Sequence, residues 1–234
     1  MPVSLRALSL ADELARSDPL NATARRFQSL SAEVLADVAI AQMQFDDALQ
    51  YAQKSLAISL DLVAKDPTDG QMQRDLYICY VKVAKVYMEM KDFQECQNQL
   101  DLALRVVQPI YERQPELLQS IGDYSFVLLK RAEAYQRSSN ALSAVKELET
   151  VIPLLESMVE ANRQDAKSRR RLANATTMLG RALLEDGQPA NARLAFERSR
   201  KLTTAMIDDG MRVEQMQLDL TEIDELLSAT VEKP

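Results

Sequence analysis

The sequence of 234 residues contains no histidine and no tryptophan, and it has only five glycines and two cysteines. Without histidine, Ser-His-Asp and Cys-His catalytic arrangements are excluded, as are histidine metal ligands. The glycines are scattered singly, so no glycine-rich phosphate loop is present. Cys79 and Cys96 match no zinc-site spacing and give no disulfide framework, which favours a reducing, cytoplasmic compartment. We therefore predict a non-catalytic protein without a metal or another cofactor.

Long apolar runs are also absent, and aromatic residues make up only 5% of the chain. No uncharged run approaches the roughly 18 residues of a membrane-spanning helix. The N-terminal stretch carries Arg6, Asp12 and Glu13, so it is a poor signal peptide. The content of 47% hydrophobic and 27% charged residues is typical of a globular protein, and scarce glycine favours helices over sheets. The composition predicts an all-helical protein with no membrane partner.

The net charge is −7, which argues against binding nucleic acid over the whole surface. The charge is unevenly distributed. Residues 163–201 contain ten Lys/Arg and four Asp/Glu, whereas residues 202–234 contain two Lys/Arg and eight Asp/Glu. Two interpretations follow: the basic segment and the acidic tail dock on one another, or the basic segment binds an acidic partner.

A period of 48 residues runs through the chain. Small residues recur at this spacing after each short break: Ala48, Cys96, Ala144 and Ala192. Three residue pairs that end in proline share the interval: Asp18-Pro19, Asp66-Pro67 and Gln114-Pro115. Because several unrelated positions share one register, we predict a repeat protein whose stacked units bury each other's apolar faces.

Each unit is predicted to be a pair of helices, the first of about twenty residues. The predicted division into a partial unit, four repeats and a terminal capping helix with a tail is 1–18, 19–66, 67–114, 115–162, 163–210 and 211–234. Residues 4–17 align with 52–65, so the chain opens in the second helix of a unit, either as a fragment of a longer protein or as an N-terminal cap. Between units, Pro67 ends one helix, and Asp69 caps the next, with Thr68 as the alternative cap.

Residues 176–199, TTMLGRALLEDGQPANARLAFERS, resemble a tetratricopeptide repeat. Gly180 and Ala192 are expected to let the paired helices approach closely, while Phe196 fills the remaining gap. The unit of 48 residues is longer than the usual 34, as in the tetratricopeptide-like repeats of bacterial proteins, including regions associated with signalling kinases. The resemblance implies an all-α, right-handed solenoid of tandem antiparallel helix hairpins.

The resemblance also implies a partner-binding groove on the inner face that the first helices line. By spacing, the predicted groove residues are Leu30, Glu33, Asp37, Ile78, Val81, Lys85, Met88, Phe126, Leu129, Glu133, Asn174, Thr177 and Arg181. An apolar strip from Ile78 to Leu129 suits an amphipathic helix or an extended apolar segment. Alternatively, the protein's own side chains fill this strip.

Arginines mark a second candidate site. Arg26, Arg74 and Arg170 hold equivalent places in their repeats, which predicts a repeated ion pair with the preceding unit. The run Arg169, Arg170 and Arg171 could bind a carboxylate or phosphate of an anionic partner through bidentate hydrogen bonds.

The predicted function is a protein–protein interaction scaffold that binds a peptide or protein partner. The main alternative is a regulatory or oligomerisation region of a larger signalling enzyme, such as a bacterial serine/threonine kinase, and it makes a homo-oligomer a further expectation. A helical enzyme is the third class, and no catalytic motif supports it.

Overall fold

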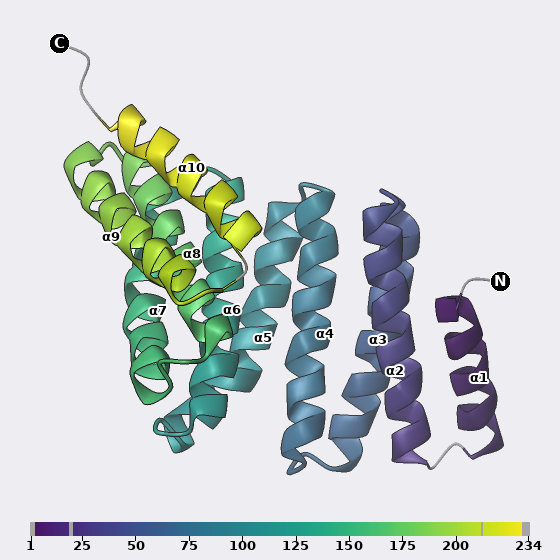
Figure 1. Cartoon of the computed structure of the whole chain (residues 1–234). Helices are drawn as coiled ribbons and strands as arrows, with labels where there is room; N and C mark the ends of the chain where they lie inside the picture. The colour runs from purple at the N-terminus through teal and green to yellow at the C-terminus, as the bar shows by residue number, and fades with distance from the viewer. Residues whose placement is uncertain (1–2, 19–20, 212, 231–234) are drawn as a thin grey trace. The chain divides into compact units, whose positions relative to one another are not determined.

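The structure is a computed structural model that describes residues 3–18, 21–211 and 213–230. These residues form ten α-helices and no strand, so the predicted all-α class is confirmed (Figure 1). Pro19 of the first predicted joint and tail residues 231–234 lie outside the described ranges. The helices are α1 Val3–Ser17, α2 Ala22–Ala41, α3 Phe45–Lys65, α4 Gly70–Glu89, α5 Phe93–Arg113, α6 Leu118–Arg137, α7 Ala141–Ala161, α8 Ala166–Glu185, α9 Pro189–Asp208 and α10 Val213–Ala229.

The chain divides into two compact units, Met1–Arg113 with α1 to α5 and Gln114–Pro234 with α6 to α10. In the first unit, α2 packs on α3 and α4 packs on α5, and α3 also contacts α4. The second unit repeats the pattern, with α6 on α7, α8 on α9, and α7 against α8. The helices at the two ends of the series, α1 and α10, pack on α2 and α9 respectively. Each unit is therefore a stack of antiparallel helix hairpins.

The helix boundaries follow the 48-residue period. The first helices of the four hairpins begin at residues 22, 70, 118 and 166, and the second helices begin at 45, 93, 141 and 189. α10 begins at Val213, one residue before the next position in the first series. α1 ends at Ser17, which corresponds to Lys65 at the end of α3. In this register α10 is a first helix and α1 is a second helix.

The joints between hairpins are capped by side chains. The carboxylate of Asp69 accepts hydrogen bonds from the backbone N–H groups of Gln71 and Met72, at 2.8 and 2.9 Å. Asn21 and Asp165 cap α2 and α8 in the same way, but the equivalent residue before α6, Leu117, has no capping side chain. Asp69 is thus the cap, as predicted. The alternative through Thr68 is wrong, because the Thr68 hydroxyl donates to Asp66 instead.

The turn inside each hairpin has a left-handed residue at the same repeat position. The φ angles of Met43, Lys91, Ser139 and Gly187 are 60°, 62°, 57° and 76°. Only glycine adopts this conformation without steric strain. Three of the four turns therefore carry a strained residue.

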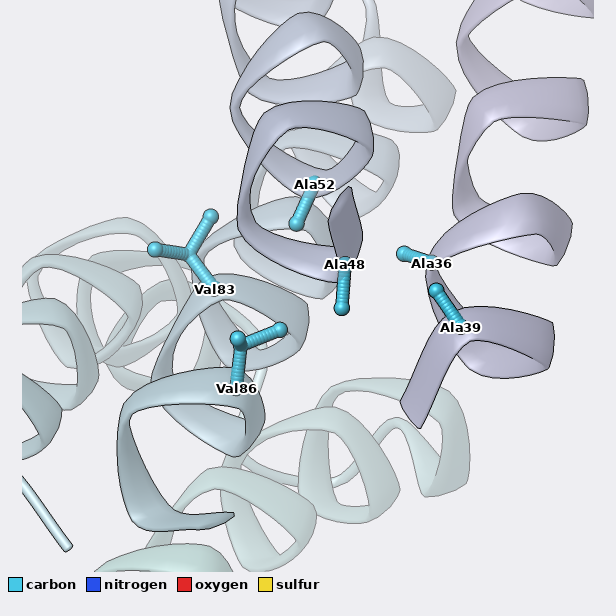
Figure 2. Close-up of a cluster of buried hydrophobic side chains, with 6 residues drawn as sticks. All are labelled: Ala36, Ala39, Ala48, Ala52, Val83 and Val86. Carbon is cyan, nitrogen blue, oxygen red and sulfur yellow. The ribbon is translucent and has the colours of Figure 1, made fainter. Parts of the chain in front are cut away.

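Small side chains fill the centre of the hairpins. Ala48, Cys96, Ala144 and Ala192 are all fully buried, so the small-residue interpretation of Cys96 is confirmed. Figure 2 shows one such cluster, in which Ala36 and Ala39 of α2, Ala48 and Ala52 of α3, and Val83 and Val86 of α4 gather together. Three helices meet closely at this cluster because four of its six members are alanines.

Candidate partner-binding face

The predicted groove residues of the first unit divide into exposed and buried members. Lys85 is exposed, and Leu30, Asp37 and Ile78 are partly exposed. The other three, Glu33, Val81 and Met88, are buried. The protein's own helices therefore cover part of the predicted strip, and a partner would meet Leu30, Asp37, Ile78 and Lys85.

Asp37 on α2 is held by two lysines of α4. Its carboxylate lies 2.6 Å from the Lys82 ammonium and 3.2 Å from that of Lys85. Burial alone would raise the pKa of Asp37, but the hydrogen bonds and charges of the two lysines outweigh it and hold the pKa below its usual value. The carboxylate is therefore ionised at neutral pH, and it compensates one of the two lysine charges.

Glu33 lies in a buried polar cluster next to this patch. The Ser55 hydroxyl and the Cys79 thiol approach its Oε1 atom at 3.3 and 3.5 Å. Ser29 links Ser55 and Ser59 at hydroxyl distances of 2.8 and 3.1 Å. Burial raises the pKa of Glu33, and burial with the neighbouring Glu33 charge raises the pKa of Cys79 to about 11. The thiol is protonated at neutral pH, so this cluster offers no activated nucleophile.

Arg26 on α2 binds Asp75 on α4. Its Nε and Nη2 atoms donate to the two carboxylate oxygens at 2.5 and 3.3 Å. The expectation that this repeat position pairs with the preceding unit is wrong for Arg26, because its partner belongs to the hairpin that follows. The reason is geometric: α2 contacts α4, and the start of α4 brings Asp75 beside Arg26.

In the second unit, the ring of Phe126 on α6 has two cations near its face. The Lys130 ammonium lies 6.0 Å from the ring centroid, and the Arg171 guanidinium of α8 lies 5.6 Å from it. Glu133 accepts a hydrogen bond of 2.8 Å from Lys130. Phe126 and Leu129 are partly exposed, so this part of α6 presents apolar side chains beside positive charge.

The predicted groove residues of α8 lie under α10. Asn174, Thr177 and Arg181 line a pocket of about 270 Å3 together with Asp219, Glu222 and Ile223 of α10. The Arg181 guanidinium forms an ion pair with Glu222. The α10 members were missed in the groove prediction, although the 48-residue period places a first helix at their position.

The three consecutive arginines of α8 have separate environments. Arg169 forms an ion pair of 2.7 Å with Asp209, whereas Arg171 lies over the Phe126 ring. Arg170 makes no ion pair within the described part of the chain. The three guanidinium groups are not gathered around one position, so the anionic-partner site stays a prediction.

Ion pairs join the basic segment to the acidic tail. Besides Arg169–Asp209 and Arg181–Glu222, the Arg200 guanidinium lies 2.7 Å from the Asp224 carboxylate. Each of these pairs links a residue of 163–201 to a residue of 202–234. The mutual docking interpretation of the charge asymmetry is confirmed.

The described residues contain neither a cluster of metal-ligating side chains nor a helix suited to cross a membrane. No group of three or more His, Cys, Asp or Glu side chains is arranged to hold a metal ion. None of the helices described combines the length and apolarity needed to cross a lipid bilayer.

Comparison with known proteins identifies the fold. No protein-family model matches the chain, and neither does any curated protein. Among solved structures, BtubC from P. vanneervenii superposes with a TM-score of 0.68 at 18% identity, over 97% of this chain and 85% of that chain. The tetratricopeptide-like repeats of a putative kinesin light chain from Podosopora anserina give 0.57 at 17% identity, over 86% of this chain and 94% of that chain. The fold is tetratricopeptide-like.

A third tetratricopeptide-like neighbour is the yeast histone chaperone Hif1. It gives a TM-score of 0.60 at 12% identity, over 88% of this chain and 96% of that chain. The three matches span nearly the whole of each protein, so the likeness extends over the repeat array rather than over one hairpin. This likeness establishes the fold alone. It does not establish the function, because one helical-repeat scaffold serves many functions.

Proposed function

We propose that this protein is a non-catalytic scaffold that binds a protein partner through the exposed face of its first helices. The observation that carries the proposal is the patch on α2 and α4, where Asp37 pairs with Lys82 and Lys85. The partly exposed Leu30 lies seven residues before Asp37 on α2, and Ile78 lies four residues before Lys82 on α4, so each shares a helix face with these charges. Hif1, a structural neighbour, is described as a scaffold protein recruiting protein complexes to core histones. That description supports a scaffold role for the same fold here.

The chemistry of the patch selects the kind of partner. Leu30 and Ile78 are partly exposed on a backbone fixed by the buried residues beneath them, so they can bury apolar side chains with little reorganisation. At the surface, Asp37 compensates one of the charges of Lys82 and Lys85, while Glu33, which also acts on Lys82, is buried. We therefore expect a helix or extended segment that carries apolar and acidic side chains together. The free cysteines, both buried, fit a reducing, cytoplasmic setting for this interaction.

Peptide titration tests the proposal. Fluorescence anisotropy with labelled amphipathic peptides compares an apolar-acidic peptide with an apolar-basic peptide of the same length. The acidic peptide should bind more tightly, and Lys85→Glu should weaken it about tenfold by reversing the charge. Ile78→Ala should also weaken it by removing apolar contact.

The choice of variants decides whether this experiment is selective. Lys146→Glu is a matched control, since Lys146 is an exposed lysine of α7, a helix of the other compact unit. Val81→Glu is unsuitable, because Val81 is buried and the new carboxylate would disturb folding. If Lys85→Glu and Ile78→Ala bind the acidic peptide as tightly as the Lys146→Glu control, the α2–α4 patch is not the binding face.

A further inference from the structure

An apolar stripe on α1 and α2 faces solvent. Phe27, Val34 and Val38 follow one face of α2, and the first two are 56% and 52% exposed. Leu10 and Leu14 on α1 are exposed as well, Leu10 by 57%. Because α1 packs on α2, we define these five residues as the α1–α2 stripe.

The repeat shows what normally covers the α1 part of this stripe. Ile58 and Leu62 of α3 hold the places of Leu10 and Leu14 one period later, and they are only 6% and 3% exposed. α3 packs on α2, the first helix of its own hairpin. Within the described residues, α1 has no such first helix before it.

The α2 part of the stripe gives the same result. One period later, Phe27, Val34 and Val38 correspond to Asp75, Lys82 and Val86 of α4. Asp75 binds Arg26, and Lys82 binds Asp37, both on α2. Val86 packs in the cluster that contains Ala36 and Ala39 of α2 (Figure 2). The stripe therefore corresponds to the surface on which the first helix of a preceding hairpin packs.

α10 is a first helix whose outer side is open. Its Met216 is buried in a cluster with Ala173 and Met206, as a first helix stacked on the preceding hairpin should be. Asp224, Leu227 and Ser228 line a groove of about 790 Å3 between α9 and α10. Four periods earlier these positions are Ala32, Leu35 and Ala36, which are buried in clusters that include residues of α3. The groove lies where a second helix would pack.

We propose that two copies of this chain associate head to tail, with α10 of one copy seated on the α1–α2 stripe of the next. α1 of the next copy then lies in the groove between α9 and α10. Together α10 and α1 complete one hairpin, so the junction continues the repeat-to-repeat interface already present within each unit. This association is separate from peptide binding at the α2–α4 patch.

The side chains at the proposed junction match in register. Leu218, which is 62% exposed, lies four periods after Arg26. Phe27 lies one period before Asp75, the ion-pair partner of Arg26. Leu218 of one copy is thus placed against Phe27 of the next. In the same way Ala229 lies four periods after Asp37, and Val34 lies one period before Lys82, the ion-pair partner of Asp37. Ala229 of one copy is thus placed against Val34 of the next. Two ion pairs of the interior become two apolar pairs at the junction.

Charge also agrees with this register. Lys54 of α3 forms an ion pair with Asp12 of α1, at 3.0 Å. Across the junction, Arg6 of one copy takes the place of Lys54, and Thr204 of the other copy takes the place of Asp12. Thr204 lies one helical turn before Asp208, and both residues line the groove. Arg6 is exposed on α1. An Arg6–Asp208 ion pair would replace the internal one.

Head-to-tail contacts use two different surfaces, so each added copy leaves one free end of each kind. The chain should therefore form a concentration-dependent series of oligomers rather than a closed symmetric dimer. Sedimentation velocity of the full chain, from micromolar to sub-millimolar concentration, should show the mean mass rising. A monomer over this entire range would overturn the proposal.

Two variants separate the surfaces. Val34→Lys blocks the stripe, and Leu218→Lys blocks α10; both positions are exposed, so each chain should fold and be monomeric. Mixed in equal amounts, the two should form a heterodimer and nothing larger, because one intact stripe and one intact α10 remain. Leu194→Lys, at an exposed position of α9, is the matched control and should associate like the wild type.

Several results contradict the proposal. If either blocked chain associates as the wild type does, or if the equimolar mixture stays monomeric, the stripe and α10 are not partners. Circular dichroism of each variant should show unchanged helicity. If Val34→Lys fails to fold, Phe27→Lys blocks the same stripe and must give the same heterodimer.

Discussion

Gly180 of α8 lies directly against the ring of Phe196 in α9. A Cβ atom built on Gly180 would lie 2.4 Å from Cε1 of Phe196, whose side chain is fully buried. The same two repeat positions hold Ala36 with Ala52, Ala84 with Leu100 and Ala132 with Leu148 in the other hairpins. The close approach expected from the sequence is therefore present, and the largest of the four side chains on a second helix faces the one glycine on a first helix.

Gly180→Ala should destabilise the second unit. Alanine favours a helix interior by about 1 kcal/mol over glycine, but overpacking a filled core typically costs about 1–3 kcal/mol. Because the Phe196 ring is fully buried and must shift to accept the added methyl group, we expect a net loss of about 1 kcal/mol in the free energy of unfolding. Urea unfolding followed by circular dichroism measures it. The double variant Gly180→Ala/Phe196→Leu should recover stability, and a single variant more stable than wild type would show that the ring yields freely.

Leu117→Asp should stabilise α6. Leu117 holds the N-cap place that Asp69 and Asp165 fill in other repeats, and it is exposed without a capping hydrogen bond. A capping aspartate is worth about 1 kcal/mol. Hydrogen exchange of the first amides of α6 should slow, while Asp69→Ala should speed exchange at the start of α4. Unchanged exchange in Leu117→Asp would mean that the α6 joint cannot adopt the geometry of the other joints.

Lys91→Gly should stabilise the turn between α4 and α5. The φ angle of Lys91 is 62°, and a left-handed residue other than glycine costs about 1–2 kcal/mol. Glycine also gains freedom in the unfolded chain, so the expected net gain is about 0.5–1 kcal/mol. The thermal unfolding midpoint measures it. Gly187→Ala is the reverse experiment at the equivalent position and should lower the midpoint; a decrease for both variants would contradict the strain.

Glu33→Gln should raise stability at neutral pH. Burial raises the pKa of Glu33 in the folded state, and the Asp75 charge acts in the same direction against the opposing effects of Cys79, Lys82 and Ser55. The folded protein thus holds this proton more tightly than the unfolded chain does. Its stabilising contribution is full below the unfolded pKa of about 4.3 and is lost as the pH rises through the folded value.

The variant and wild type should therefore converge in acid and diverge towards neutral pH. Urea unfolding at several pH values measures the difference, with Glu149→Gln at an exposed position of α7 as the control. Equal stability of wild type and Glu33→Gln at every pH would mean that the carboxylate is solvated in the native state.

The hairpins could be predicted from the sequence because their signals are local and recur. The small residues Ala48 and Cys96 and the cap Asp69 each occupy one repeat position, so the period shows them together. The exposure of the predicted groove residues could not be predicted to the same degree. Whether Val81 faces solvent or the core depends on the orientation of α4 against its neighbouring helices. The periodicity of apolar residues in α4 does not specify that orientation.

Ion pairs between hairpins were equally hard to foresee. Arg26 finds its partner in the following hairpin rather than the preceding one, and Asp37 meets Lys82, 45 residues away in sequence. Such pairs depend on side-chain reach across two helices, and oppositely charged residues are too numerous for spacing alone to select the right ones. The exposure of Phe27 and Val34 becomes meaningful only when they are compared with their buried or paired counterparts in α4.

The helix starts of the four hairpins follow the 48-residue spacing without an inserted or deleted residue. An in-frame duplication or loss of one period in the gene would therefore add or remove a whole hairpin and leave the remaining joints in register. The length of such a protein can change in evolution by complete hairpins, while the residues that fit one hairpin to the next stay the same.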